Sequence, residues 1–368
     1  MKITDIEVQC YSWPRPKPIS NGKYTYTTVD VNLIHVHTDQ GLTGIGWGGG
    51  TAAGRPGEIT TALVEHFKQA LVGQDPFCYR RLWEEMWLPK LVGRRGISTQ
   101  VISGIDIAIW DLLGKAVGQS VHRLLGAFRD RIPTYIAGGY YEEGKGLNEL
   151  AQEMEDNLDL GARAIKMKVG GVPINEDVER VRVVRETIGP DVKLLVDANN
   201  AYVAYEAIEI ARKMEQYDVF WFEEPVAPDD YIGHAQIAAA SAIPVATGEN
   251  EYTRYGFRDL IEHRSAAIFN ADAQILGGIT EFMNVAALAA AHDLQIAPHG
   301  AQEVHIHLVA AIPNGLILEF YRETVDPLRG QIFQNPLVLD ADGYTAVPDS
   351  PGLGIEPNYD ILKAHRVG

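Results

Sequence analysis

The chain has 368 residues, of which 46 % are hydrophobic and 22 % charged, which is the composition of an ordinary globular protein and excludes a disordered or fibrous one. This length exceeds what one small core needs and fits a barrel with a second module. The formal net charge of −17 would repel phosphate backbones and anionic lipids, so we expect neither nucleic acid nor a membrane as partner. A small anionic substrate would need local positive charge, from a metal or from lysines.

The two cysteines, Cys10 and Cys78, are typical of a reducing compartment. Residues 1–7 alternate apolar and polar and include acids, which predicts a first strand and not a signal peptide. The sequence contains no stretch of about 18 or more apolar residues, so we expect no transmembrane helix. We therefore expect a cytoplasmic protein.

Residues 1–125 have mixed α and β character. Strand patterns cover residues 3–11 and 29–38, with a polar, turn-rich loop at 14–28 between them and a Gly-rich stretch at 41–54 after them. Helical patterns follow at 58–71, 79–87 and 99–115. In the last of these, Ile102, Ile105 and Ile109 recur at helical spacing and predict one buried face.

From about residue 130, short apolar runs alternate with helical stretches. We expect strands at residues 133–137, 164–169, 193–197, 219–223, 245–249, 267–272, 295–298 and 316–319, and helices at 147–160, 175–188, 204–217, 280–291 and 304–312. Eight such strands predict a parallel sheet closed into a barrel over residues 126–321. The Pro- and Gly-rich segment 322–368 is expected to pack back onto the first module.

Polar residues lie at or just after the ends of the barrel strands, each about one β–α unit from the last. They are Lys166 and Lys168, Asp197 and Asn199, Glu223, Glu249, Asp272, His299 and Glu319. Residues at the same end of consecutive parallel strands form a ring, and in barrels of this type the active site lies at the carboxyl mouth.

Three acids of this ring, Asp197, Glu223 and Glu249, would converge too closely for all three to stay ionised alone. A hard divalent cation with oxygen ligands resolves this, and the absence of sulfur or paired imidazole argues for Mg²⁺ over zinc. The neighbouring Glu224 cannot face the mouth together with Glu223, and we assign it a supporting position.

A proton acceptor is available on either side of this predicted metal. Lys166 and Lys168 share one strand face, and mutual repulsion beside a metal predicts a lowered pKa, so that neutral Lys168 can act as a base. His299 is a second base, oriented by Asp272. Glu319 would lie near the substrate carboxylate and could donate a hydrogen bond only if protonated.

This series resembles the mandelate racemase subgroup of the enolase superfamily. The local contexts agree: IKMKVG at 165–170, WFEEP at 221–225, TGEN at 247–250 and PGLGI at 351–355. The resemblance implies an α+β capping domain, a modified (β/α)₇β barrel, one Mg²⁺ on Asp197, Glu223 and Glu249, and bases on opposite substrate faces. It also implies that Lys166 and Glu319 contact the substrate carboxylate, and a homo-oligomer, either a dimer or an octamer.

Members of that subgroup are mostly acid-sugar dehydratases, and capping-domain loops set their specificity. Here those loops are residues 20–26 and 47–51, and the candidate substrate contacts are Asn21, Lys23, Tyr24, Trp47 and Asn199. A polar loop suits a polyhydroxylated acid better than an aryl substrate. We expect α-proton removal followed by loss of the β-hydroxyl, with His299 as general acid and Lys23 near a distal carboxylate. The product would be a 2-keto-3-deoxy acid.

Two other functions stay open: a racemase or epimerase using the same two bases, and a non-catalytic binding barrel. Among further motifs, Gly44-x-Gly46-x-x-Gly49 matches a dinucleotide fingerprint, but no helix follows it directly, so we interpret it as a flexible lid loop. His35 and His37 share a strand face without an evident third metal ligand. We expect His305 and His307 to be structural.

Overall fold

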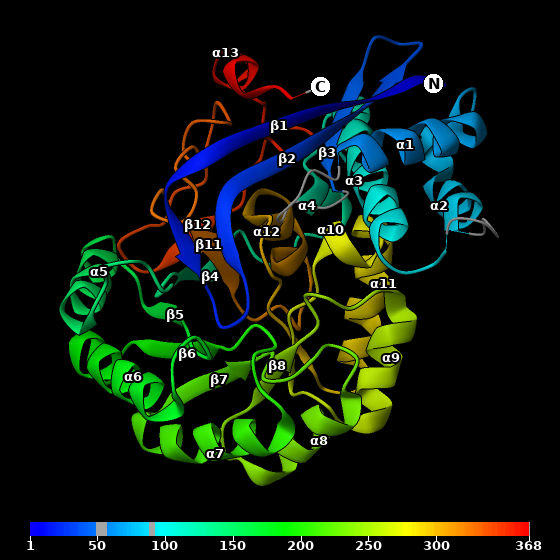
Figure 1. Cartoon of the computed structure of the whole chain (residues 1–368). Helices are drawn as coiled ribbons and strands as arrows, with labels where there is room; N and C mark the ends of the chain where they lie inside the picture. The colour runs from blue at the N-terminus through cyan, green and yellow to red at the C-terminus, as the bar shows by residue number, and fades with distance from the viewer. Residues whose placement is uncertain (49–56, 88–92, 368) are drawn as a thin grey trace.

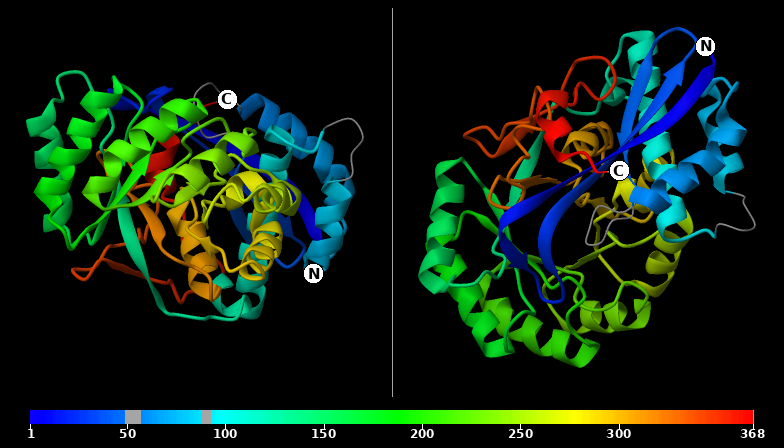
Figure 2. Two further views of the ribbon diagram at one scale, coloured as in Figure 1. Left: turned by 90° about the horizontal axis from the view of Figure 1, so that it is seen from below. Right: turned by 45° about the horizontal axis from the view of Figure 1, so that its top comes forward.

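A computed structural model describes residues 1–48, 57–87 and 93–367. It has a ring of parallel strands surrounded by helices, and a smaller antiparallel sheet whose long first hairpin crosses over that ring (Figure 1). Turning the molecule shows the same hairpin reaching over the barrel, with the helices of the first module beside it (Figure 2).

The capping sheet has the order β1-β2-β3, formed by β1 (Ile3–Ser20), β2 (Thr25–Thr38) and β3 (Thr43–Trp47). Its helices are α1 (Gly57–Leu71), the short η1 (Pro76–Cys78), α2 (Tyr79–Trp87), α3 (Ile97–Val117) and α4 (Val121–Leu124). Helix α3 is apolar and long enough to cross a membrane, but 89 % of its most apolar window is buried inside the protein, as expected for a core helix.

The predicted loop at 14–28 is wrong. Strands β1 and β2 stay paired from Ile3 with Thr38 to Ser20 with Thr25, with a register shift between Pro14 and Ile19. The prolines at 14, 16 and 18 are typical of a loop. They are tolerated here because β1 is an edge strand, where a missing backbone N–H need not break the hydrogen-bond ladder. The hairpin therefore extends over the barrel as regular structure.

Two of the three glycines of the fingerprint-like motif are also not in a lid loop. Gly44 and Gly46 lie on β3 against α3, where an added Cβ would be 2.0 Å from the Ala108 carbonyl oxygen and 2.2 Å from that of Gly104. Gly49 lies outside the described residues. Glycine is needed on this strand because the helix backbone approaches it closely.

Gly46→Ala should lower the free energy of unfolding by about 2 kcal/mol, because the new methyl group must push backbone against backbone. Urea unfolding measures this, with Thr27→Ala at an exposed position of β2 as the control that should change little. Equal stability of the two variants would contradict the close packing.

The barrel strands are β4 (Arg131–Ala137), β5 (Ala164–Lys168), β6 (Lys193–Asp197), β7 (Val219–Glu223), β8 (Val245–Thr247), β9 (Ile268–Phe269), β10 (Gln295–Ile296) and β11 (Leu318–Tyr321). They are hydrogen-bonded in the order β10-β9-β8-β7-β6-β5-β4-β11. Gly315, just before β11, bridges Ile296 on β10 and closes the ring. The predicted capped (β/α)₇β barrel is confirmed.

The barrel helices are α5 (Leu147–Asp159), α6 (Ile174–Ile188), α7 (Ala204–Met214) with η2 (Glu215–Tyr217), α8 (Tyr231–Ala240), α9 (Thr253–His263), α10 (Ala273–Leu276), α11 (Gly278–Ala290) and α12 (Gln302–Ala311). Of these barrel helices, α8, α9 and α10 were not predicted from the sequence. Aliphatic side chains fill the layer between the strands and the helices, and Leu194, Val196 and Ala211 are among them.

Residues beyond 321 contact both modules. β12 (Tyr344–Ala346) pairs with β4, and α13 (Tyr359–Leu362) and η3 (Lys363–His365) come before Arg366, which bridges Tyr11 on β1. The buried carboxylate of Asp111 on α3 accepts the amides of Ile45 and Leu353, each at 2.8 Å. It thus joins β3, α3 and the C-terminal segment.

Candidate active site

Strand register places the polar ring at one mouth of the barrel. Lys168, Asp197 and Glu223 are consecutive partners across β5, β6 and β7. Lys166 is two residues before Lys168 on the same strand face and is fully buried. Glu249 comes two residues after β8, beyond Gly248, whose φ of 126° redirects the chain.

The acids Asp197, Glu223 and Glu249 each offer a ligand oxygen within 4.8 Å of the others, and all three are buried. Burial raises the pKa of Glu223 to about 8, helped by the charges of Asp197 and Glu249 and opposed by Lys166. Glu249 Oε2 is buried and makes no hydrogen bond with a described residue. Three oxygen donors and a buried oxygen in need of a partner fit a divalent cation, and Mg²⁺ suits this set.

Glu224 supports this trio from behind. Its φ of 40° turns the chain so that both adjacent glutamates are buried. Its carboxylate accepts hydrogen bonds from Asn200 at 2.5 Å and from Asn250 at 2.9 Å. The side chain therefore fixes the loops after β6 and β8.

Both lysines are paired with carboxylates. Lys166 Nζ lies 2.9 Å from Glu223 and 2.7 Å from Glu319, and Lys168 Nζ lies 2.5 Å from Asp197. Burial works against the charge of Lys168, but attraction to Asp197 holds its pKa above the ordinary value. Lys166 acts in the predicted direction, but without a metal the acids outweigh its repulsion. The lowered pKa of Lys168 beside a bound metal stays a prediction.

The condition under which Glu319 could donate a hydrogen bond, a protonated carboxyl group, is not met. Burial would raise its pKa, but Lys166 and His299 outweigh this and bring the pKa down to about 2. Glu319 Oε2 accepts the backbone amide of Gly300 at 2.6 Å. The ionised carboxylate accepts hydrogen bonds and holds both Lys166 and the loop after β10.

His299 and Asp272 form the expected pair, with Nδ1 3.0 Å from Asp272 Oδ2. The other oxygen of Asp272 accepts the amide of Gln274 at 2.7 Å and caps α10, which fixes the carboxylate. His299 Nε2 lies 3.6 Å from Glu249 and 3.5 Å from the Tyr321 hydroxyl. Burial lowers the pKa of His299, but Glu249 and Asp272 more than offset this and raise it well above the ordinary value.

His305 also lies near Asp272, yet its ring is neutral. Nε2 accepts the Ala273 amide at 2.9 Å and Nδ1 donates to the Gly300 carbonyl at 2.7 Å. Burial lowers its pKa. This histidine fixes the loops that carry Asp272 and His299.

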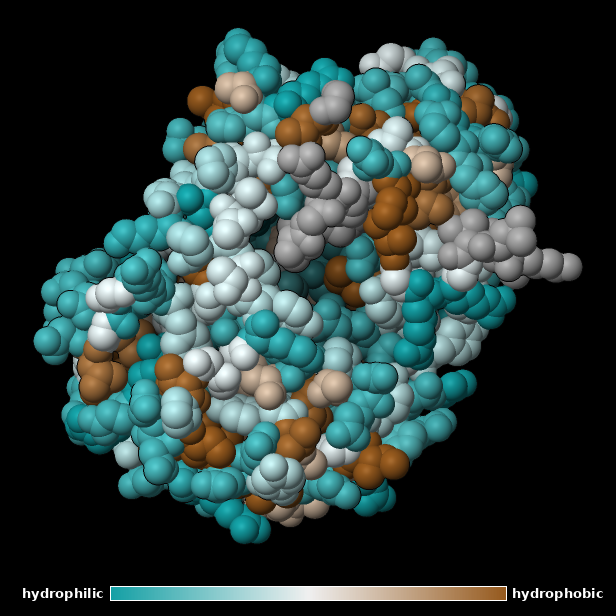
Figure 3. Space-filling model, viewed as in Figure 1, coloured by the Kyte–Doolittle hydropathy of each residue, from teal (hydrophilic) through white to brown (hydrophobic). Residues whose placement is uncertain are grey.

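A cavity of about 680 Å³ opens at this mouth, under the capping hairpin. The space-filling view shows the corresponding hollow in the middle of this face, with mostly hydrophilic surroundings (Figure 3). Of the expected residues, those that line it are Lys168, Glu249, Asp272, His299, Lys23, Tyr24, Trp47 and Asn199. The size and the mixed lining are those of a small-molecule site.

Asn21 does not line this cavity, because its side chain is held in the hairpin turn. Its Oδ1 accepts the amides of Lys23 and Tyr24 at 2.8 and 2.7 Å. Its amide group donates to the Tyr26 hydroxyl at 3.0 Å. Part of the expected loop at 47–51 lies outside the described residues.

Several cavity-lining side chains were not singled out from the sequence, among them Arg15, Tyr26, Tyr140 and Tyr321. Tyr321 lies two residues after Glu319 on β11, so strand alternation could have found it. Arg15 and Tyr26 belong to the hairpin that was interpreted as a loop.

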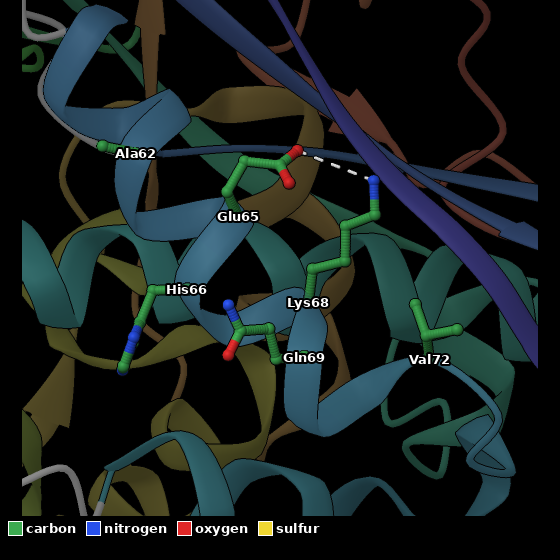
Figure 4. A pocket seen from close by; sticks show the side chains of 6 residues that line it. All are labelled: Ala62, Glu65, His66, Lys68, Gln69 and Val72. Carbon is green, nitrogen blue, oxygen red and sulfur yellow. Dashed lines mark ion pairs between the residues drawn. The ribbon is translucent and has the colours of Figure 1, made fainter.

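Two other features carry no comparable chemistry. A shallow hollow is lined only by residues of α1 and by Val72, and its Lys68 is paired with Glu65 and Asp5 (Figure 4). His35 donates to or accepts from the Tyr359 hydroxyl at 2.8 Å, and burial lowers its pKa to about 4. His35 and His37 stack with ring centroids 6.2 Å apart.

Two family models together cover most of the chain. The mandelate racemase / muconate lactonizing enzyme N-terminal domain matches residues 3–126, and the enolase C-terminal domain-like family matches residues 149–361. Similar solved structures include a racemase from Streptomyces coelicolor with bound magnesium, at 30 % identity and a TM-score of 0.92 over 99 % of this chain and 100 % of that one.

Curated relatives match over nearly the same length. An arabinonate dehydratase from Saccharolobus solfataricus is 34 % identical over 92 % of this chain and 91 % of its own. An L-talarate/galactarate dehydratase from Salmonella typhimurium is 35 % identical over 96 % and 88 %. A D-galactarolactone cycloisomerase from Agrobacterium fabrum is 33 % identical over 100 % and 99 %. With both domain models matched and the acid trio in place, this chain belongs to the mandelate racemase subgroup of the enolase superfamily.

Proposed function

We propose that this protein dehydrates a sugar acid to a 2-keto-3-deoxy acid in a Mg²⁺-dependent reaction. The observation that carries the proposal is that Lys168 and the His299–Asp272 pair line one cavity together with Glu249, a member of the buried acid trio. The dehydratases among the relatives support the reaction class. A non-catalytic barrel would have no need to keep both bases and all three acids together.

The reaction divides between two proton-transfer groups. Bound to Asp197, Glu223 and Glu249, Mg²⁺ would supply positive charge that offsets these acids and so releases Lys168 from the attraction that keeps it protonated. Lys168 then takes the α-proton. His299 donates its Nε2 proton to the departing β-hydroxyl, which leaves as water, and the resulting enol tautomerises to the 2-keto acid.

The test is a panel of aldonates and aldarates incubated with Mg²⁺, in which keto product is detected as the semicarbazone. Reactive and unreactive acids are then repeated in D₂O and followed by NMR. Keto product from at least one acid is expected. Deuterium at the α-carbon without loss of water would replace dehydration by racemisation or epimerisation. No turnover and no exchange across the panel would contradict the proposal.

An isomerase remains the second candidate, because two bases flank the site and a cycloisomerase is among the relatives. Such an enzyme would use Lys168 and His299 to remove and return the α-proton. The D₂O experiment separates it from a dehydratase, since it retains all substrate oxygen atoms.

Asp272→Asn should lower kcat by about 100-fold while KM changes little, because the amide no longer fixes the tautomer of His299. Steady-state kinetics and the pH profile of kcat measure this. Gln274→Ala is the control for disturbance of α10, because Gln274 lies on that helix next to Asp272 and is not one of the two bases. An unchanged pH profile in Asp272→Asn would contradict the orienting role.

A further inference from the structure

Trp221 lies on β7, two residues before the acid Glu223 of the trio. Side chains at positions i and i+2 of a strand point to the same face, so both residues point into the barrel. The Trp221 indole is fully buried, and its Nε1 donates a hydrogen bond to Glu223 Oε2 at 3.0 Å. A buried indole N–H needs an acceptor, and here that acceptor is a metal-site carboxylate. The hydrogen bond therefore joins the barrel core to the trio.

Packing inside the barrel holds the indole in this orientation. The Tyr135 ring packs against it edge to face, with centroids 5.4 Å apart and 87° between the ring planes. Leu195 is its partner on the neighbouring strand β6. The rest of this buried interior cluster consists of small and aliphatic residues, namely Ala137, Ala164, Ala246, Ile268, Ala297 and Ile317. Because the two large rings fill the space between these side chains, the direction of the N–H is fixed before any cation binds.

The other side chains that donate to the trio are charged. Lys166 Nζ lies 2.9 Å from Glu223 Oε1 and 3.0 Å from Oε2, and Lys168 Nζ lies 2.5 Å from Asp197 Oδ2. An ammonium group brings positive charge toward the place where a divalent cation would bind, so both lysines oppose the metal. Among the described residues, Trp221 is the only uncharged side chain that donates to the trio. Its N–H can therefore hold Glu223 in place without repelling a cation.

We propose that Trp221 is a positioning residue for the metal, whose N–H holds Glu223 in the orientation that binds Mg²⁺. The affinity for Mg²⁺ then depends on a core residue that is not itself a ligand. This inference rests on the metal site of the proposed function and is independent of the substrate and of the reaction catalysed. Removing a hydrogen-bond partner of a metal ligand typically lowers metal affinity by about 10- to 100-fold.

The test measures Mg²⁺ binding by calorimetric titration in the wild type and in Trp221→Phe, which loses the N–H but keeps an aromatic ring. Leu195→Ala is the packing control, because it opens a void in the same interior cluster without removing a polar atom. Trp110→Phe is the second control, because it also loses a buried indole N–H, which donates to the Thr280 hydroxyl at 2.9 Å and not to the trio. Thermal unfolding of each metal-free protein reports the loss of packing separately.

We expect Trp221→Phe to weaken Mg²⁺ binding by about 10- to 100-fold. Leu195→Ala and Trp110→Phe should keep the wild-type affinity, although they unfold at lower temperatures. An equal loss of affinity in Leu195→Ala, or wild-type affinity in Trp221→Phe, would overturn the inference and leave the metal site standing. A wild type that does not bind Mg²⁺ would overturn both. Benzothienylalanine at position 221, in which sulfur replaces the N–H, gives the same comparison with the packing intact, should Trp221→Phe fail to fold.

A double-mutant cycle shows whether Trp221 acts through Glu223. The binding of Mn²⁺, which takes the same oxygen ligands and is followed by electron paramagnetic resonance, is measured with and without Trp221→Phe in the wild type and in Glu223→Gln. An amide oxygen accepts a hydrogen bond more weakly than a carboxylate does, so Trp221→Phe should cost less affinity in the Glu223→Gln background. An equal loss in both backgrounds would mean that Trp221 does not act through this carboxylate.

Discussion

Lys168→Ala is expected to lower kcat by about 10⁴-fold while Mg²⁺ affinity is kept or improved. Loss of a positioned general base accounts for the rate, at the upper end of its usual contribution. Metal affinity should not fall, because Lys168 is no ligand and its ammonium, 2.5 Å from Asp197, competes with a cation for that carboxylate. Stopped assays give kcat, and calorimetric titration with Mg²⁺ gives the dissociation constant.

Exchange experiments refine this expectation. In Lys168→Ala, solvent deuterium should no longer enter at the α-carbon from the lysine side, even over long incubations. Lys193→Ala, an exposed lysine at the start of β6, should behave as the wild type. Near-normal turnover in Lys168→Ala would remove the lysine from the proton-transfer step.

Glu249→Gln is expected to weaken Mg²⁺ binding by about 1000-fold. The change removes one unit charge from the trio, and a charge pair near 4 Å is worth about 4 kcal/mol at the effective dielectric of protein sites. The metal-free variant should unfold at the same temperature or a higher one, since a buried like charge is removed. Thermal unfolding with and without Mg²⁺ separates the two effects.

Glu251→Gln is the matched control for this change. Glu251 is buried in the same segment, but it accepts the Tyr231 hydroxyl at 2.5 Å and lies outside the trio. Its variant should keep the stabilisation by Mg²⁺ that Glu249→Gln loses. If both variants respond to Mg²⁺ as the wild type does, the trio is not the metal site.

The polar ring could be predicted because a parallel barrel converts spacing along the chain into proximity. Lys168, Asp197 and Glu223 end consecutive strands, and strand register alone makes them neighbours. His299 and Asp272 followed from the same rule, although both lie in loops just beyond short strands. In these cases local pattern and global fold point to the same arrangement.

What could not be predicted depends on tertiary context. The edge position that tolerates prolines in β1 exists only once the sheet has formed, and so Arg15 was not recognised as a cavity residue. The ionisation of Lys168 and Glu319 in the metal-free protein could not be judged from the sequence, because each pKa depends on every charge around it. Helix α8 has apolar residues around much of its surface, so it lacks the periodic pattern that predicts a helix.

The contacts of Asp111 have a consequence for how the protein is made. Its carboxylate needs the amide of Leu353 as well as that of Ile45, and Arg366 bridges Tyr11. On the ribosome, the first module therefore emerges while the barrel is still being synthesised. Its contacts with Leu353 and Arg366 can form only after those residues have been made. The domain that covers the substrate cavity should be the last to reach its native protection, and pulse-labelled hydrogen exchange during translation would place its completion after residue 353 leaves the exit tunnel.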